Sequence, residues 1–246
     1  MYFLAWRDVK VRYKQTVLGL FWALLKPFLT MLIFSVVFGH FAHIPSEGVP
    51  YPIFSYCGLL PWLFFSQALT QSSLSLIANV QIVSKVYFPR VAIPLSAILS
   101  SFVDFAVGLI LLVAMMAYYH IHPTAGLLAV PLLVVLATVA ATGVGLWLSA
   151  LSVRYRDVAH IIPFLVQLWM FATPVVYPAQ IIGGKAQLLV ALNPMAGVVE
   201  GFRWATLGVA RPDPVLLFAS GLISVALLVS GLLYFSHAEP SFADLA

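Results

Sequence analysis

Charged side chains are rare in the apolar parts of this sequence, so the few that lie there are the first candidates for chemistry. Asp104 falls near the middle of a long apolar run, where an acidic residue costs roughly 2.5 to 3.5 kcal/mol in a membrane. Such a carboxylate either relays protons or bonds to a hydroxyl or an amide of a neighbouring helix. Because no second carboxylate lies in the core of another run, the sequence favours the structural role for Asp104.

Motifs for nucleotide, nucleophile and metal chemistry do not match. Gly183-Gly184-Lys185 resembles part of a phosphate-binding loop, but Ala179 replaces its first glycine, and Ala186 follows the lysine where Ser or Thr is needed. The sequence has no G-x-S-x-G or H-E-x-x-H pattern, and its one cysteine and six histidines lack the spacing of a zinc site. We therefore expect no catalytic residue, bound metal or cofactor in this chain.

The composition is that of a membrane protein. Hydrophobic residues make up 63% of the 246 residues and charged residues 8%, and the mean hydropathy is +1.05, whereas about a quarter of the residues of a soluble domain are charged. A helix of about 20 apolar residues crosses a membrane. The sequence predicts one all-α domain, residues 1–246, with six transmembrane helices near 21–41, 57–78, 91–119, 125–151, 158–177 and 215–235.

The distribution of basic residues predicts the orientation. Of the twelve Lys and Arg residues, nine fall before the first run, at its start, or in the second and fourth connections, and three fall in the segment between the fifth and sixth runs. Basic residues are retained on the cytoplasmic side. We therefore expect both termini in the cytoplasm.

The segment 178–213, between the fifth and sixth runs, contains two short apolar helix patterns. Asn193-Pro194 separates them as a helix N-cap followed by a proline at the first helical position. Each pattern is too short to cross a membrane and too apolar for a free loop, so we expect re-entrant helices on the periplasmic side. Glu200 and Arg203, three residues apart, should pair on the second one.

Residues 2–20 predict an amphipathic helix that lies in the membrane interface. Trp6 and Tyr13 fall on its apolar face, and Arg7, Lys10 and Lys14 are assigned to the opposite, basic face. Such a helix places its rings at the acyl boundary and its cations on anionic lipid or on a partner. The alternative is a solvated N-terminal helix.

The second apolar run is unusually polar for a transmembrane helix. Gln67, Thr70 and Gln71 lie in it together with four serines, and these groups must face other helices or water. Two interpretations stay open, namely hydrogen bonding between helices and the lining of a hydrophilic conduit.

Four stretches of sequence resemble a known family. They read W-R-D-V-K-V-R-Y-K-Q-T-V-L-G-L-F-W-A-L-L-K-P at 6–27, N-V-Q-I-V-S-K-V-Y-F-P-R at 79–90, S-V-R-Y-R-D-V at 152–158 and N-P-M-A-G-V-V-E-G-F-R at 193–203. Together, and in this order, they resemble the membrane (permease) subunit of type-2 ABC exporters of polysaccharides, the group that exports O-antigen, capsule and teichoic acid. The resemblance extends over nearly the whole chain.

This resemblance implies how the protein works. It implies a homodimer that binds two copies of a separate ABC ATPase, which holds the ATP and Mg, and that interacts with membrane lipid but not with nucleic acid. A lipid-linked polysaccharide would pass along the dimer interface from cytoplasm to periplasm. Residues 79–90 would be the cytoplasmic coupling loop that contacts the ATPase, although a plain basic turn is an alternative for this loop. The expected contact residues are Lys85, Val86, Tyr87, Phe88 and Arg90.

Sugar rings present apolar faces that stack on aromatic side chains, so aromatic residues are candidates for the glycan path, although many belong to the interfacial belt. The expected channel-lining residues are Gln67, Thr70, Gln71, Tyr56, Trp62 and Trp169. Other functions stay open at this point. They are a type-2 ABC exporter of drugs or lipids, a membrane-embedded transferase, which would need more acidic or His residues around one cavity, and a secondary transporter, which would show an inverted repeat.

Overall fold

The computed structural model describes residues 3, 5–7, 9–10, 19–81, 88–183 and 189–242, and every regular element in these residues is helical. Five helices are long and apolar enough to cross a membrane, so the protein is an all-α, multi-pass membrane protein. They are α2 (Gly19–Phe34) with its π-helical continuation η1 (Ser35–Phe41), α3 (Tyr51–Ala78), α5 (Ala92–Tyr118), α6 (Val130–Arg154) preceded by the 3-10 turn η2 (Ala125–Ala129), and α10 (Pro214–Ala238).

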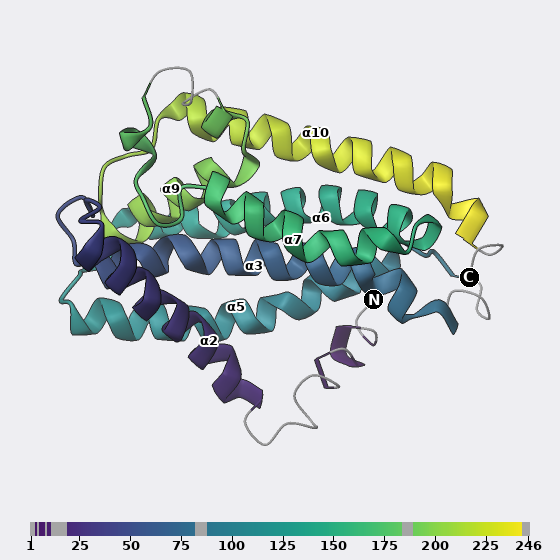
Figure 1. Cartoon of the computed structure of the whole chain (residues 1–246), viewed down its shortest axis with the longest axis horizontal. Coiled ribbons are helices and arrows are strands. Elements are labelled where there is room, and N and C mark those ends of the chain that lie inside the picture. The colour runs from purple at the N-terminus through teal and green to yellow at the C-terminus, as the bar shows by residue number, and fades with distance from the viewer. Residues whose placement is uncertain are drawn as a thin grey trace.

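Helix α3 lies at the centre of the bundle (Figure 1). It packs between α5 and α6, and α10 covers the other side of α6. Helix α2 crosses α3 and α5 obliquely (Figure 1). The buried share of the most apolar part of the helix is 78% for α3, 11% for α2 with η1 and 17% for α10. Helices α2 and α10 therefore present most of their surface to lipid or to another chain.

The fifth apolar run forms a shorter helix than the sequence predicts. Helix α7 (Asp157–Ala172) has 16 residues and is about 24 Å long, and it ends at Thr173, whose backbone is extended with ψ 139°. Pro174 causes this end, because a proline disfavours helical backbone in the residue before it. The second apolar run forms a longer helix than the sequence predicts. Helix α3 begins at Tyr51 rather than near residue 57, because Pro52 stands at the helix start, where a proline is tolerated.

Helix α9 (Pro194–Leu207) begins where the sequence predicts. The side chain of Asn193 accepts a hydrogen bond from the Met195 backbone N–H at 3.0 Å, and Gly208 ends the helix in the left-handed conformation, with φ 68°. Thirteen of its residues are buried, against α3, α6, α10 and η2. The first of the two predicted short helices lies mostly outside the described residues, with 189–191 helical.

Candidate functional site

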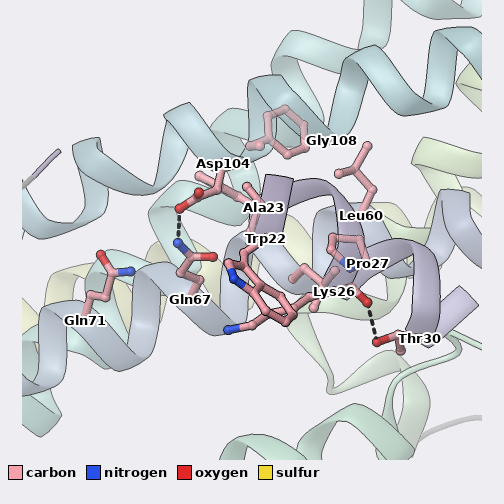
Figure 2. Close-up of a pocket in the computed structure, with 13 residues that line it drawn as sticks. Trp22, Ala23, Lys26, Pro27, Thr30, Leu60, Gln67, Gln71, Asp104 and Gly108 are labelled. Carbon is pink, nitrogen blue, oxygen red and sulfur yellow. Dashed lines mark hydrogen bonds between the residues drawn. The ribbon is translucent and has the colours of Figure 1, made fainter. Parts of the chain in front are cut away.

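A cavity of about 630 Å³ lies between α2, α3 and α5 (Figure 2). Its volume is in the range of small-molecule binding sites. Helix α2, which crosses the other two helices at an angle (Figure 1), forms one wall of the cavity. The cavity is lined by Trp22, Ala23, Lys26, Pro27 and Thr30 of α2, Leu60, Leu63, Phe64, Gln67 and Gln71 of α3, and Asp104, Phe105 and Gly108 of α5.

The polar side of this cavity is built by α3 and α5. The Gln67 amide donates a hydrogen bond to the Asp104 carboxylate across the two helices (Figure 2). One turn further along α3, the Gln71 amide oxygen accepts from the hydroxyls of Ser100 at 3.1 Å and Ser101 at 3.4 Å. The prediction that Asp104 bonds to an amide of a neighbouring helix is therefore confirmed. These contacts hold the amides and the carboxylate at the border of the open volume.

Helix α2 contributes a cation and an aromatic ring to the cavity. The Lys26 side chain is exposed at its edge, and Trp22 lies one turn before it and is 47% exposed. Pro27 interrupts the backbone hydrogen bonding of α2 next to Lys26, and the Thr30 hydroxyl donates to the Lys26 carbonyl at 2.9 Å (Figure 2). Sequence reasoning missed Trp22 and Thr30, although their spacing of four residues on either side of Lys26 marks one helix face.

Two predicted channel residues lie in the packed core instead of at this cavity. Tyr56 is 0% exposed, and its hydroxyl donates to the Gly108 carbonyl at 2.9 Å. Trp62 is 2% exposed and packs on Phe65. The Thr70 hydroxyl donates to the Ser66 carbonyl of its own helix at 2.8 Å. The sequence could not separate these residues from the cavity, because α3 is surrounded by other helices on nearly every side.

Trp169 borders a different cavity, of about 470 Å³, between the end of α7 and the start of α9. Its indole N–H donates to the Asn193 side-chain oxygen at 3.0 Å, the same oxygen that caps α9. Tyr177 and Pro194 also line this space. Of the six residues that the sequence assigns to one channel, Gln67 and Gln71 line the first cavity, Trp169 lines the second, and Tyr56 and Trp62 lie in the core, whereas Thr70 is half-buried and lines neither cavity.

Arg203 forms the centre of a buried polar network next to α9. Its guanidinium is paired with Glu200 at 3.0 Å, as the sequence predicts, and also donates to three backbone carbonyls. These are Phe54 at 3.3 Å, Tyr177 at 3.2 Å and Val175. The same guanidinium lies 3.9 Å from the centre of the Phe54 ring, which adds a cation–π interaction.

The network joins the chain after α7 to α3 and α9. Glu200 accepts from the Ala179 backbone N–H at 3.2 Å, and the Tyr51 hydroxyl donates to the Val176 carbonyl at 2.6 Å. Burial raises the pKa of Glu200 and lowers the pKa of Arg203, and the attraction between the two charges opposes both shifts. Because each charge has several fixed partners, this pair holds the structure together and leaves little capacity to bind a ligand.

The predicted ATPase-contact segment is held at both of its ends. Lys85, Val86 and Tyr87 lie outside the described residues. Phe88 is half-buried against a hydrophobic cluster, and the Arg90 backbone N–H donates to the Glu239 carboxylate at 3.1 Å. At the other end of the segment, Asn79 accepts a hydrogen bond from the Arg7 guanidinium at 2.7 Å.

The described part of the N-terminal segment corrects one predicted position. Residues 5–7 and 9–10 are helical, and the Lys10 ammonium lies 5.5 Å from the centre of the Trp6 ring. The two side chains therefore share a face and do not lie on opposite faces. Four residues correspond to about 400°, so their directions differ by only about 40°. Tyr13 and Lys14 lie outside the described residues.

Among the described residues no group of three His, Cys, Asp or Glu is placed to hold a metal ion. The Glu200–Arg203 pair is enclosed by its fixed partners, whereas the cavity between α2, α3 and α5 combines amides, a carboxylate, an ammonium and a tryptophan. Such a surface can hydrogen-bond hydroxyl groups and stack against an apolar ring face. It has the chemistry of a binding surface and lacks an arranged nucleophile and base.

Comparison with known proteins identifies relatives over nearly the full length. The O-antigen export system permease protein RfbA of Myxococcus xanthus is 30% identical over 241 residues, which are 97% of this chain and 92% of the relative. The RfbA permease of Klebsiella pneumoniae is 28% identical, with the same shares covered. The polysialic acid transport protein KpsM of Escherichia coli is 23% identical over 95% of this chain and 91% of its own length.

A family model described as ABC-2 type transporter matches residues 1–207. The matched region contains the helices that line the cavity, the segment 79–90 and the whole of α9. Together with the multi-pass helical fold, this match shows that the chain belongs to the ABC-2 type transporter family.

Proposed function

We propose that this chain is the transmembrane subunit of an ATP-driven exporter that moves a lipid-linked polysaccharide, such as an O-antigen, from the cytoplasm to the periplasm. The observation that carries the proposal is the match, over more than nine-tenths of both chains, to permeases named for O-antigen export. A relative of lower identity is named for the transport of polysialic acid, which is also a polymer of sugars. Three relatives thus agree on the class of cargo.

The cavity between α2, α3 and α5 has the chemistry that a glycan requires. Gln67, Gln71 and Asp104 supply hydrogen-bond donors and acceptors for sugar hydroxyls, and Trp22 supplies an exposed ring on which a sugar can stack. Lys26 adds a cation for a phosphate of the lipid carrier. We assign to this cavity a role in holding part of the cargo at membrane depth.

ABC-2 family membership implies that a separate ABC ATPase supplies the energy. In the proposed complex, two copies of this chain bind two ATPase subunits, which hold the ATP and Mg, and this chain has no catalytic role. The segment 79–90 contacts the ATPase. Contacts at its two described ends, from Arg7 to Asn79 and from Arg90 to Glu239, support this role, because they attach both ends of the segment to other parts of the chain.

The proposed complex lies in the bacterial inner membrane, with six crossings per chain and both termini in the cytoplasm. Helix α7 runs alongside α6 toward α9 (Figure 1). This course supports counting α7 as a crossing in addition to the five long helices, although it has only 16 residues. The burial of α9 among α3, α6 and α10 supports a re-entrant position on the periplasmic side. An apolar helix that is too short to span the membrane is tolerated at membrane depth when other helices bury it in this way.

The test is a reconstitution of this chain with its ATPase partner in lipid vesicles, supplied with a lipid-linked O-antigen on the side of the ATPase. We expect ATP-dependent transfer of the polymer to the opposite side, detected by its accessibility to a lectin. The chain without its partner should not hydrolyse ATP, because no phosphate-binding loop is present.

Two outcomes would overturn the proposal. Hydrolysis of ATP by the purified chain alone would contradict the assignment of energy supply to a partner. Transfer of a fluorescent lipid or a dye by the complex, without transfer of the polymer, would favour an exporter of drugs or lipids instead. A gene deletion in the source bacterium gives the same contrast, because loss of surface polysaccharide is expected only for the polysaccharide exporter.

A further inference from the structure

The segment 79–90 is attached to the C-terminal end of the chain, 149 residues away. The Arg90 backbone N–H donates to the Glu239 carboxylate at 3.1 Å, and the Arg90 guanidinium donates to the Glu239 carbonyl. Glu239 opens the short 3-10 turn η4 (Glu239–Ser241) that directly follows α10. One residue of this turn thus binds both the backbone and the side chain of Arg90.

Phe242 anchors the same turn in an apolar cluster. Its side chain is 1% exposed, and its ring centre lies 5.4 Å from that of Phe235 on α10. The cluster also contains Leu76 of α3 and Ile93 of α5, the helices on either side of segment 79–90, together with Leu146 and Ala150 of α6. Residues 239–242 are here called the C-terminal turn. Through Phe242 this turn packs in one cluster with residues near the ends of α3, α5 and α6.

The position of the carboxylate matters as much as its charge. Arg90 lies two residues before the start of α5, where backbone N–H groups have no partner within the helix. A carboxylate at such a helix start is favoured by the helix dipole. Glu239 therefore fixes the direction in which the chain leaves segment 79–90 and enters α5, and it does so from the end of α10.

We propose that the C-terminal turn is a positioning element for energy coupling, with Glu239 and Phe242 linking α10 to the end of segment 79–90. Movement of the ATPase at this segment is then transmitted both to α5, along the chain, and to α10, across the Arg90–Glu239 contact. This inference rests on the proposed function, because it assumes that segment 79–90 receives the movement of an ATPase.

The test uses the complete complex of this chain and its ATPase in vesicles and compares wild type with Glu239→Gln and with Phe242→Ala. Both variants should assemble with the ATPase at wild-type yield. The amount of polymer exported per ATP hydrolysed should fall about five-fold for Phe242→Ala, a ratio that corresponds to roughly 1 kcal/mol. It should fall about two-fold for Glu239→Gln, because glutamine keeps an oxygen that accepts more weakly from the Arg90 N–H. Asp157→Asn is the matched control, because it removes an exposed carboxylate at the start of α7 and should leave the ratio unchanged.

A double variant shows whether both hydrogen bonds of this contact carry coupling. Arg90→Gln removes the guanidinium bond to the Glu239 carbonyl, and Glu239→Gln weakens the separate bond from the Arg90 backbone N–H, so the double variant should lower the export ratio further than either single variant. A wild-type ratio in both Glu239→Gln and Phe242→Ala, at normal assembly, would overturn the inference. Failure of the wild-type complex to export polymer would instead overturn the proposed function, so the two failures are distinguishable.

Discussion

The two halves of α3 differ in how the polar groups beside them are bound, and they are here called the closed half, next to α9, and the open half, next to the cavity. At the half next to α9, the Arg203 guanidinium is buried and bound to Glu200 and to three carbonyls. At the other half, Gln67 and Gln71 bond across to α5 but still border a cavity of about 630 Å³. The comparison teaches that a polar group inside a membrane protein is enclosed when fixed partners surround it, and stays accessible to a ligand when it borders open space.

The largest effect should come from breaking the closed half. Arg203→Ala removes the cation and leaves the Glu200 carboxylate buried without its main partner, and breaking a buried pair in this way costs about 3 to 5 kcal/mol. We expect a strong loss of folded protein, measured as the amount in the membrane and as thermal unfolding in detergent.

Arg211→Ala is the control for this variant. Arg211 is exposed, with its guanidinium 5.8 Å from the centre of the Trp204 ring, so its removal should leave both measurements close to wild type. Equal unfolding temperatures for Arg203→Ala and wild type would show that the network does not stabilise the fold, and the contrast between the two halves of α3 would be lost.

A smaller but still clear effect is expected when the same network is crowded rather than broken. A Cβ atom at Gly58 would overlap the Arg203 guanidinium and lie 2.6 Å from the Val175 carbonyl oxygen, and overpacking of this kind costs about 1 to 3 kcal/mol. Gly58→Ala should therefore lower the unfolding temperature. Gly221→Ala on α10, where a Cβ atom meets nothing within 4 Å, should not, and a similar decrease in both variants would point to a general intolerance of the bundle.

Local features of this fold could be predicted from the sequence. The Asn193 cap, the Glu200–Arg203 pair and the bond from an amide to Asp104 are all confirmed, because each depends on short spacing or on the need of a buried charge for a partner. The sequence pattern misplaces the end of α7, because Pro174 stops the helix although the apolar pattern continues past it.

Features that depend on distant segments could not be predicted. The carbonyls that bind Arg203 come from α3 and from the chain after α7, and no spacing in the sequence indicates that they meet. The contact between Arg90 and Glu239 has the same character. The sequence predicts a channel position for Tyr56 because an aromatic ring can stack on a sugar, whereas the burial of this side chain depends on the helices around α3.

The smallest effect is expected at the open half, with Asp104→Asn. Asparagine keeps the shape of the side chain and an oxygen that can accept from the Gln67 amide. If Asp104 positions Gln67 at the cavity, protein levels should stay at wild type and export should change by no more than about two-fold, since a neutral hydrogen bond is only about half as strong as a charge-assisted one. A proton relay would behave differently, because asparagine cannot exchange a proton, and export would then be abolished.

Export should be measured in cells at two external pH values, with Asp213→Asn as the control. Asp213 is exposed and caps α10 through Val215, and asparagine caps a helix equally well. Near-normal export for both variants at both pH values supports the positioning role, whereas complete loss in Asp104→Asn alone would move Asp104 from the structure of the cavity to the mechanism of transport.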